Sequence, residues 1–133
     1  MAIRFVRPVT PTVALEFAGG RSFMRKVLLM QCRRYEAIAI YDDDEPVALA
    51  MLNHERPRRV EIGAIFAPAA RTRMRLVIRA TQLTLRGFAQ NRILAWTRVS
   101  PANPLGQRLA MLIGMEPGRM RDPAIWIYRG DRT

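Results

Sequence analysis

Apolar and polar positions along the first part of the chain follow short strand-like patterns. Residues 2–9 alternate apolar and polar side chains, whereas residues 35–41 and 46–53 are two apolar runs. Alternation of this kind and short apolar runs are typical of β-strands, and the acidic residues 42–45 between the two runs are typical of a turn. The pattern therefore predicts a first strand followed by a β-hairpin with a solvated acidic turn.

Two helices are predicted between the first strand and the hairpin. Thr10 is suited to cap a helix over residues 11–17, because its hydroxyl can accept a hydrogen bond from the first turn and a proline follows it. Ser22 is suited in the same way to cap a helix over residues 23–33. The side chains expected to face the core on this second helix are Phe23, Val27, Leu28 and Met30.

In the second half of the chain, apolar strands alternate with amphipathic helices. Strands are predicted over residues 60–67, 92–99 and 124–128, and helices over residues 70–90 and from Pro104, capped by Asn103, to the closing Gly114. Strands connected by helices form parallel crossovers, whereas a hairpin is antiparallel. The predicted fold class is therefore α/β, with a mixed sheet flanked by helices.

Length and composition fit a single domain over residues 1–133, with Trp96 and Trp126 in its core. No apolar run approaches the roughly 18–20 residues that span a bilayer, and early charged residues interrupt the apolar segment that a signal peptide needs. The single cysteine, Cys32, permits neither an internal disulfide nor a cysteine metal cluster. We expect an intracellular protein that is not secreted and has no membrane partner.

The chain carries a formal net charge of +11, and its 22 basic residues are all arginine apart from Lys26. Guanidinium groups form paired contacts with carboxylates and phosphates, so an acidic partner is one expectation. The alternative is that the arginines are solvated cations that matter only for solubility and loose attraction to polyanions. On the helix over residues 70–90, four arginines fall on the side opposite the apolar stripe. This arginine row is either a solvated face or a docking surface for an acidic partner, and it consists of Arg71, Arg75, Arg79 and Arg86.

Neither a metal site nor a nucleic-acid-binding motif is indicated by the sequence. Consecutive acids such as residues 42–45 cannot all converge on one ion, and the only histidine, His54, excludes a two-histidine site. No metal site is therefore expected. Zinc-finger and RRM signatures are also absent, so DNA binding would depend on charge alone and would weaken steeply with salt.

Two partial signatures resemble those of the GNAT superfamily of acyl-CoA-dependent N-acetyltransferases. Residues 66–71, FAPAAR, match the hydrophobic, proline and arginine positions of the family pattern V-x-P-x-x-R-G-x-G-x-G. The later family pattern around the last helix is matched in part by Asn103, Gly106, Leu109, Gly114 and Met115. The predicted order of strands and helices is similar to that of the family over essentially the full length. The resemblance implies the GNAT fold and an acetyl-CoA site.

The chain departs from the family pattern where the cofactor would bind. Family members hold the pyrophosphate of acetyl-CoA with backbone N–H groups at the start of the third helix, where glycines let the backbone approach closely. Thr72, Met74 and Leu76 replace those glycines, although neighbouring arginines could still attract phosphate. The cofactor-binding candidates that the resemblance implies are Phe66, Arg71, Thr72, Arg73, Met74, Arg75, Leu76 and Asn103.

The second departure from the family pattern concerns the residues that would transfer protons. Many family enzymes have a tyrosine in the fourth helix that protonates the leaving thiolate, and Ala110 occupies the matching position. Glu61, on the strand over residues 60–67, is the candidate catalytic base if the protein is active. Its alternative role is that of a strand residue paired with a nearby arginine, and the alternative role of Asn103 is helix capping alone.

A similar loss of the glycine loop, with basic residues in its place, occurs in small acetyltransferase-like proteins encoded among the virion and ejection genes of short-tailed phages. The resemblance implies a non-catalytic GNAT-fold protein of a phage virion or of its assembly, located in the virion or the host cytoplasm, with acidic protein, virion components or DNA as partners. No cofactor is then expected. The alternative is an acetyl-CoA-dependent N-acetyltransferase with a divergent loop, and a third possibility is a nucleic-acid binder that acts through charge alone.

Overall fold

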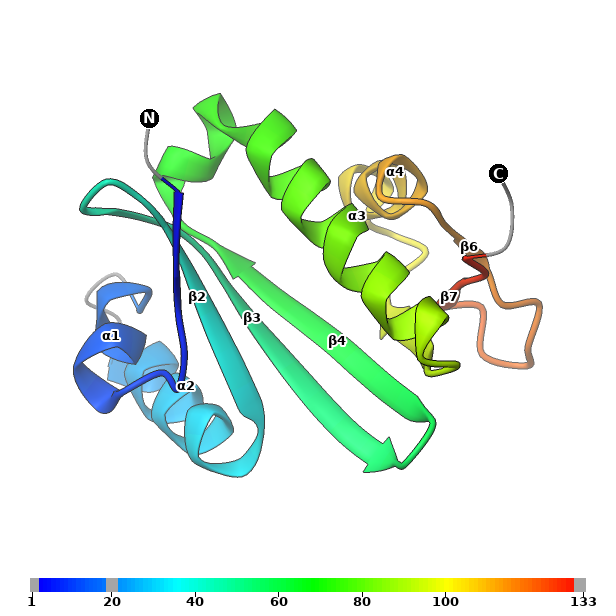
Figure 1. Cartoon of the computed structure of the whole chain (residues 1–133), viewed down its shortest axis with the longest axis horizontal. Coiled ribbons are helices and arrows are strands. Elements are labelled where there is room, and N and C mark those ends of the chain that lie inside the picture. Colours follow the sequence, from blue (N-terminus) through cyan, green and yellow to red (C-terminus); the bar gives the residue numbers. More distant parts are fainter. Residues whose placement is uncertain (1–2, 19–21, 131–133) are drawn as a thin grey trace. The chain divides into compact units, whose positions relative to one another are not determined.

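The structure is a computed structural model that describes residues 3–18 and 22–130. The elements are β1 (Ile3–Val6), α1 (Pro11–Glu16), α2 (Ser22–Arg34), β2 (Glu36–Asp42), β3 (Glu45–Arg56), β4 (Arg59–Phe66), the 3-10 helix η1 (Pro68–Thr72), α3 (Met74–Gln90), β5 (Leu94–Arg98), α4 (Pro104–Leu112), β6 (Met115–Pro117) and β7 (Ile125–Tyr128) (Figure 1). The strands form a seven-stranded mixed sheet in the order β1-β2-β3-β4-β5-β7-β6. This arrangement confirms the predicted mixed α/β class.

The chain divides into two compact units. The first unit comprises residues 1–53 and 63–74, and the second comprises residues 54–62 and 75–133. The single-domain organisation of residues 1–133 stays a prediction.

The end of the chain differs from the sequence prediction in two respects. The short strand β6 was not expected, because a three-residue segment that ends in proline has no strand pattern of its own. It pairs antiparallel with β7, with Met115 opposite Tyr128. The chain therefore turns back after α4 before it reaches β7, so that β7 runs antiparallel to β5. The expected parallel crossover into the last strand is wrong, and of the two crossovers only the one from β4 to β5 is parallel.

The core of the first unit lies between its helices and strands β2 and β3. Leu28 of α2 and Leu49 of β3 are completely buried, and Tyr41 of β2 packs against Phe17 with the two rings nearly perpendicular. α1 begins as the sequence predicts, because the Thr10 hydroxyl accepts a hydrogen bond from the N–H of Val13 at 3.3 Å. α2 begins at Ser22, so the prediction that Ser22 caps this helix from outside it is wrong.

The orientation of α2 also corrects the sequence analysis. Leu28 faces the core as expected, together with the partly buried Met24 and Cys32. Phe23 and Met30 instead point outward, with exposed fractions of 77% and 60%. Because residues four apart lie on the same side of a helix, the choice of Met24, Leu28 and Cys32 as the buried row turns Phe23 and Met30 away from it. The predicted inward positions of Phe23 and Met30 are therefore wrong.

The hydroxyl of Tyr41 donates a hydrogen bond of 2.5 Å to Oε2 of Glu16. Burial, and then this contact with a carboxylate, raises the pKa of Tyr41 from its ordinary value of 10.0 to about 12. The folded state thus favours the protonated phenol, whereas the unfolded chain loses this proton near pH 10.

We expect this difference in pKa to make stability fall in alkaline solution. The contribution of Tyr41 is fully present below about pH 10 and is lost as the pH rises through about 12, because the unfolded state then binds fewer protons than the folded state. Chemical unfolding of the wild type and of Tyr41→Phe across this range measures the effect. The free-energy difference between them should shrink as the pH rises, and a constant difference would contradict the assignment.

The second unit has buried residues on β5, β7 and α3. Ala95 and Trp96 of β5, Trp126 of β7 and Leu85 of α3 are all buried, which confirms the prediction for the two tryptophans. α4 is capped by Asn103, whose side-chain oxygen accepts a hydrogen bond of 3.0 Å from the N–H of Gly106. After the helix, Gly114 has a φ of +100°, a backbone conformation that residues with a side chain rarely adopt. Both ends of α4 are therefore as predicted.

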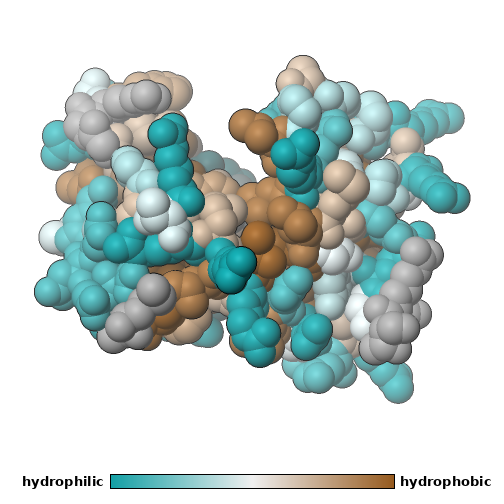
Figure 2. Space-filling model, turned by 90° about the horizontal axis from the view of Figure 1, so that it is seen from above, coloured by the Kyte–Doolittle hydropathy of each residue, from teal (hydrophilic) through white to brown (hydrophobic). Residues whose placement is uncertain are grey.

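Apolar side chains also reach the surface. Figure 2 shows brown, hydrophobic residues exposed among teal, hydrophilic ones on the face that it draws. The exposed large apolar residues are Phe5, Phe23, Met30, Phe66, Leu83, Leu105, Met111, Leu112 and Met120. Over residues 3–18 and 22–130, we find no helix with the length and apolar content that crossing a membrane requires.

Candidate functional site

The segment that corresponds to the glycine loop of the resembled family forms a closed turn. Pro68 begins the 3-10 helix η1, and Arg73 ends it in a non-helical conformation before α3 begins at Met74. The backbone N–H of Ala70 donates to the carbonyl of Ala67 at 2.9 Å, and that of Arg73 donates to the carbonyl of Ala70 at 3.0 Å. The predicted continuous helix over residues 70–90 is therefore wrong at its start, because proline at the first position and the break at Arg73 separate two helices.

The same segment is attached to strand β3 of the first unit. The N–H of Ala67 donates to the carbonyl of Val47 at 2.9 Å, immediately before η1 begins. Ala70, in the middle of η1, is buried. The turn is thus fixed by backbone hydrogen bonds and by packing of its alanine side chains.

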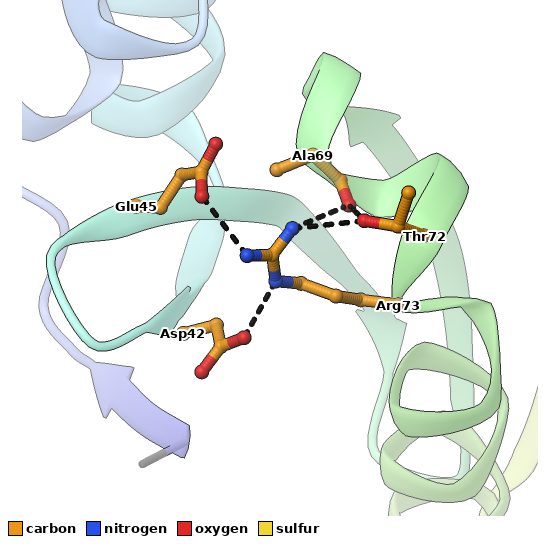
Figure 3. A network of polar contacts seen from close by, with 5 residues as sticks. All are labelled: Asp42, Glu45, Ala69, Thr72 and Arg73. Carbon is orange, nitrogen blue, oxygen red and sulfur yellow. Dashed lines mark hydrogen bonds and ion pairs between the residues drawn. The ribbon is translucent and has the colours of Figure 1, made fainter. Parts of the chain in front are cut away.

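Arg73 connects this turn to the acidic hairpin turn (Figure 3). Its Nε donates to Oδ2 of Asp42 at 2.5 Å, and its Nη2 donates to Oε2 of Glu45 at 3.0 Å. Its Nη1 donates to the carbonyl of Ala69 at 3.3 Å and to the hydroxyl of Thr72 at 3.0 Å. The hydrogen bond that Arg73 donates to Asp42, and the nearby carboxylates, raise the pKa of Arg73, so the guanidinium stays charged. One side chain thereby joins β2, β3 and η1.

The acidic turn differs from its predicted solvated state. Asp42 is only 6% exposed, and it pairs across the hairpin with Glu45, so both carboxylates face Arg73. Asp43, with a φ of +53°, and Asp44 form the exposed tip. Among the residues that the structure describes, no group of three potential ligands could hold a metal ion. The prediction of a solvated turn is correct for the tip and wrong for Asp42, because a cation distant in sequence reaches it.

The residues of this segment do not form an ordinary pyrophosphate cradle. A cradle needs backbone N–H groups that point outward and a backbone that an anion can approach closely. Two N–H groups of this turn are used internally, and Thr72 and Met74 carry side chains where glycines would stand. The charge of Arg73 is already balanced by Asp42 and Glu45. The predicted cofactor contacts of residues 71–76 stay predictions.

The two positions considered for proton transfer lie in the second unit. Glu61 is half-buried on β4, opposite Trp96 of β5 in the parallel ladder. Within residues 3–18 and 22–130, Glu61 forms no ion pair, so the expected pairing with a neighbouring arginine is not observed. Ala110 is buried in α4 and has no group that could donate a proton. The role of Glu61 as a base stays a prediction.

The arginine row of the sequence analysis is shorter than expected. Arg71 belongs to η1 and not to α3, so its place in a continuous helical row is wrong. Arg75, Arg79 and Arg86 are exposed on α3, and in the described chain none of the three forms an ion pair. We call these three residues the α3 arginine row. Sequence reasoning did not include the exposed Leu83, which follows Arg79 by one helical turn.

Comparisons with known proteins identify the fold. No protein-family model matches the sequence, and no curated protein matches it either. Solved structures do match: the aminoglycoside acetyltransferase AAC(6')-Ib in complex with coenzyme A and kanamycin is 15% identical, with 95% of this chain and 94% of that chain covered and a TM-score of 0.66.

Two further solved structures are similar to this chain over nearly its full length. A protein from Desulfovibrio desulfuricans assigned to the GNAT family of acetyltransferases is 13% identical, with 95% of both chains covered and a TM-score of 0.68. A chimera of the spermidine N-acetyltransferase SpeG from Vibrio cholerae and hSSAT is 13% identical, with 94% and 91% covered and a TM-score of 0.60. The chain therefore has the GNAT acetyltransferase fold, and at these identities the likeness concerns the fold alone.

Proposed function

We propose that this chain is a GNAT-fold protein that does not catalyse acetyl transfer and that acts by binding an acidic partner. The observation that carries the proposal is the closed turn over residues 68–73, in which Arg73 is directed to Asp42 and Glu45. Two N–H groups and one cation that make internal contacts are not at the same time available to a diphosphate.

The position of the catalytic acid supports the same proposal. Ala110 is buried and chemically inert, so a family mechanism that protonates a thiolate from this position is not possible here. Glu61 is half-buried without an arginine partner among the described residues, and it is the one observation that favours the enzyme alternative. A base alone, without a place for the cofactor, does not suffice for acetyl transfer.

The α3 arginine row is the proposed partner-binding surface. Arg75, Arg79 and Arg86 lie on one side of the helix, and unpaired guanidinium groups form strong, geometrically specific contacts with carboxylates. Arg71 is exposed beside them in sequence and is a further candidate. With a net charge of +11, the protein should attract an acidic protein over a longer range as well. We propose a component of a phage virion or of its assembly as this partner, on the basis of the sequence resemblance.

Calorimetric titration with acetyl-CoA tests the catalytic part of the proposal. We expect no saturable binding at micromolar concentration, because the turn would have to open and Arg73 would have to leave two carboxylates before a diphosphate could bind. Tight binding with one molecule per chain, together with activity that is lost in Glu61→Gln, would establish the acetyltransferase alternative instead.

The partner-binding part is tested by purification of particle components on the immobilised protein. Replacement of Arg75, Arg79 and Arg86 by serine should abolish retention, whereas Arg119→Ser/Arg121→Ser, which removes two exposed arginines elsewhere, should retain it. DNA binding through charge alone predicts a different result. Affinity would then fall steeply with salt, and both sets of variants would weaken it in proportion to the charge removed.

A further inference from the structure

Helix α2 presents an unexpected surface in the first unit. Its buried side is occupied by Leu28, with the partly buried Met24 and Cys32 beside it. On the opposite side, Phe23 and Met30 are exposed, and they lie seven positions apart in the sequence. Seven residues correspond to two helical turns, so the two apolar side chains stand on the same side about 10 Å apart.

Helix α2 is strongly basic, and Lys26, Arg33 and Arg34 line the same hollow as Met30. α2 contains Arg25, Lys26, Arg33 and Arg34 and no acidic residue. Within the described residues, none of these four cations forms an ion pair, although the guanidinium of Arg34 lies 5.8 Å from the centre of the Tyr35 ring. Isolated surface apolar residues need no explanation, but an apolar pair between unpaired cations is typical of a binding surface.

The surface is also hollowed. A shallow depression of about 460 Å³ is lined by Lys26, Leu29, Met30, Arg33 and Arg34. Its apolar part is formed by Leu29 and Met30, and its edges carry the cations. An apolar side chain of a partner could therefore be buried there while carboxylates on either side of it meet Lys26 and Arg33.

We propose that this face of α2 is a docking surface for an acidic amphipathic helix of another protein, distinct from the α3 arginine row. A facing helix with two apolar residues two turns apart matches Phe23 and Met30, and glutamates beside them match the cations. Nucleic acid is the poorer match. Phosphates would use the cations, but they give no reason for an exposed Met30 and a hollow lined by Leu29.

The test measures fluorescence anisotropy of a labelled synthetic peptide added to the full chain at about 0.15 M salt, where exposed charges are screened beyond about 8 Å. The peptide is amphipathic, with leucines two turns apart flanked by glutamates. We expect saturable binding that Phe23→Ser/Met30→Ser weakens at least about tenfold, since buried apolar anchors dominate such interfaces. Lys26→Ser/Arg33→Ser should weaken it to a similar extent.

The chain offers a matched control in α4. Leu105 and Leu112 are exposed and also lie seven residues apart, so Leu105→Ser/Leu112→Ser removes an equal apolar pair elsewhere and should leave peptide binding unchanged. Because the altered residues are exposed, thermal unfolding should be unchanged in all these variants, which separates loss of binding from loss of folding.

Three results would overturn the proposal. They are absence of peptide binding, equal binding by Phe23→Ser/Met30→Ser, and equal binding of a peptide with the same composition in scrambled order. Tighter binding of a single-stranded DNA oligonucleotide, with loss in the same variants, would assign the surface to nucleic acid. Serine replacement of the α3 arginine row should leave peptide binding intact, so failure of the proposed function and failure of this proposal are separately visible.

Discussion

Replacement of Leu28 by alanine is expected to lower the free energy of unfolding by about 2–5 kcal/mol, the range for large cavities in a packed core. Leu28 has no exposed surface, and it contacts a cluster that includes Phe17, Leu49 and Tyr41. Truncation would leave a space that the helix and the sheet can fill only in part. Unfolding by urea, followed by circular dichroism, measures the loss.

Met30→Ala is the matched control on the same helix. Met30 lies on the outward side of α2, and surface replacements usually change stability by less than about 0.5 kcal/mol. A large effect at Met30 together with a small effect at Leu28 would contradict the orientation of α2, in which Leu28 is buried and Met30 is exposed. It would also remove the docking surface proposed for this face, because that surface requires Met30 to be exposed.

Replacement of Arg73 by methionine is expected to cause the other large loss. The change leaves the buried Asp42 without its ion-pair partner, and within the described chain Oδ1 of Asp42 already lacks a hydrogen bond. A buried carboxylate without a partner is strongly unfavourable, so the midpoint of thermal unfolding should fall by several degrees. Differential scanning calorimetry provides the measurement.

Two comparisons make this prediction specific to the contact. Arg71→Met removes an exposed arginine of the same turn and should have little effect. Asp42→Asn in the Arg73→Met background should recover part of the lost stability, because the unpaired buried charge is then removed. If the Arg73 variant unfolds at the temperature of the Arg71 variant, the ion pair does not fix the turn, and the main support for a closed cofactor loop is lost.

Much of the fold was predictable because its signals are local. The cap of α1 at Thr10 and that of α4 at Asn103 are hydrogen bonds between residues three apart, which the sequence places together once a helix forms. The hairpin and the mixed α/β class follow from short apolar runs and their connections in the same way. The departures from the family pattern, Thr72 and Ala110 among them, were also visible in the sequence.

The candidate site was less predictable because its contacts are distant in sequence. Arg73 could be recognised as a cation beside a lost glycine loop, but its partner Asp42 lies 31 residues away. No local pattern indicates that the acidic turn and this arginine meet. The same holds for η1: the proline at its start was visible in the sequence, whereas the break at Arg73 was not.

The sequence by itself determined the order of strands and helices apart from η1 and β6, the caps of two helices and the chemical groups missing from the cofactor loop. Only the tertiary structure decided which face of α2 is buried, where α3 begins, that β6 pairs with β7, and which carboxylates hold Arg73. Capping and periodicity act over three or four residues, so they can be recognised along the chain. The burial of a face and the partner of a charge depend on the elements that the fold brings next to them, and these can lie anywhere in the sequence.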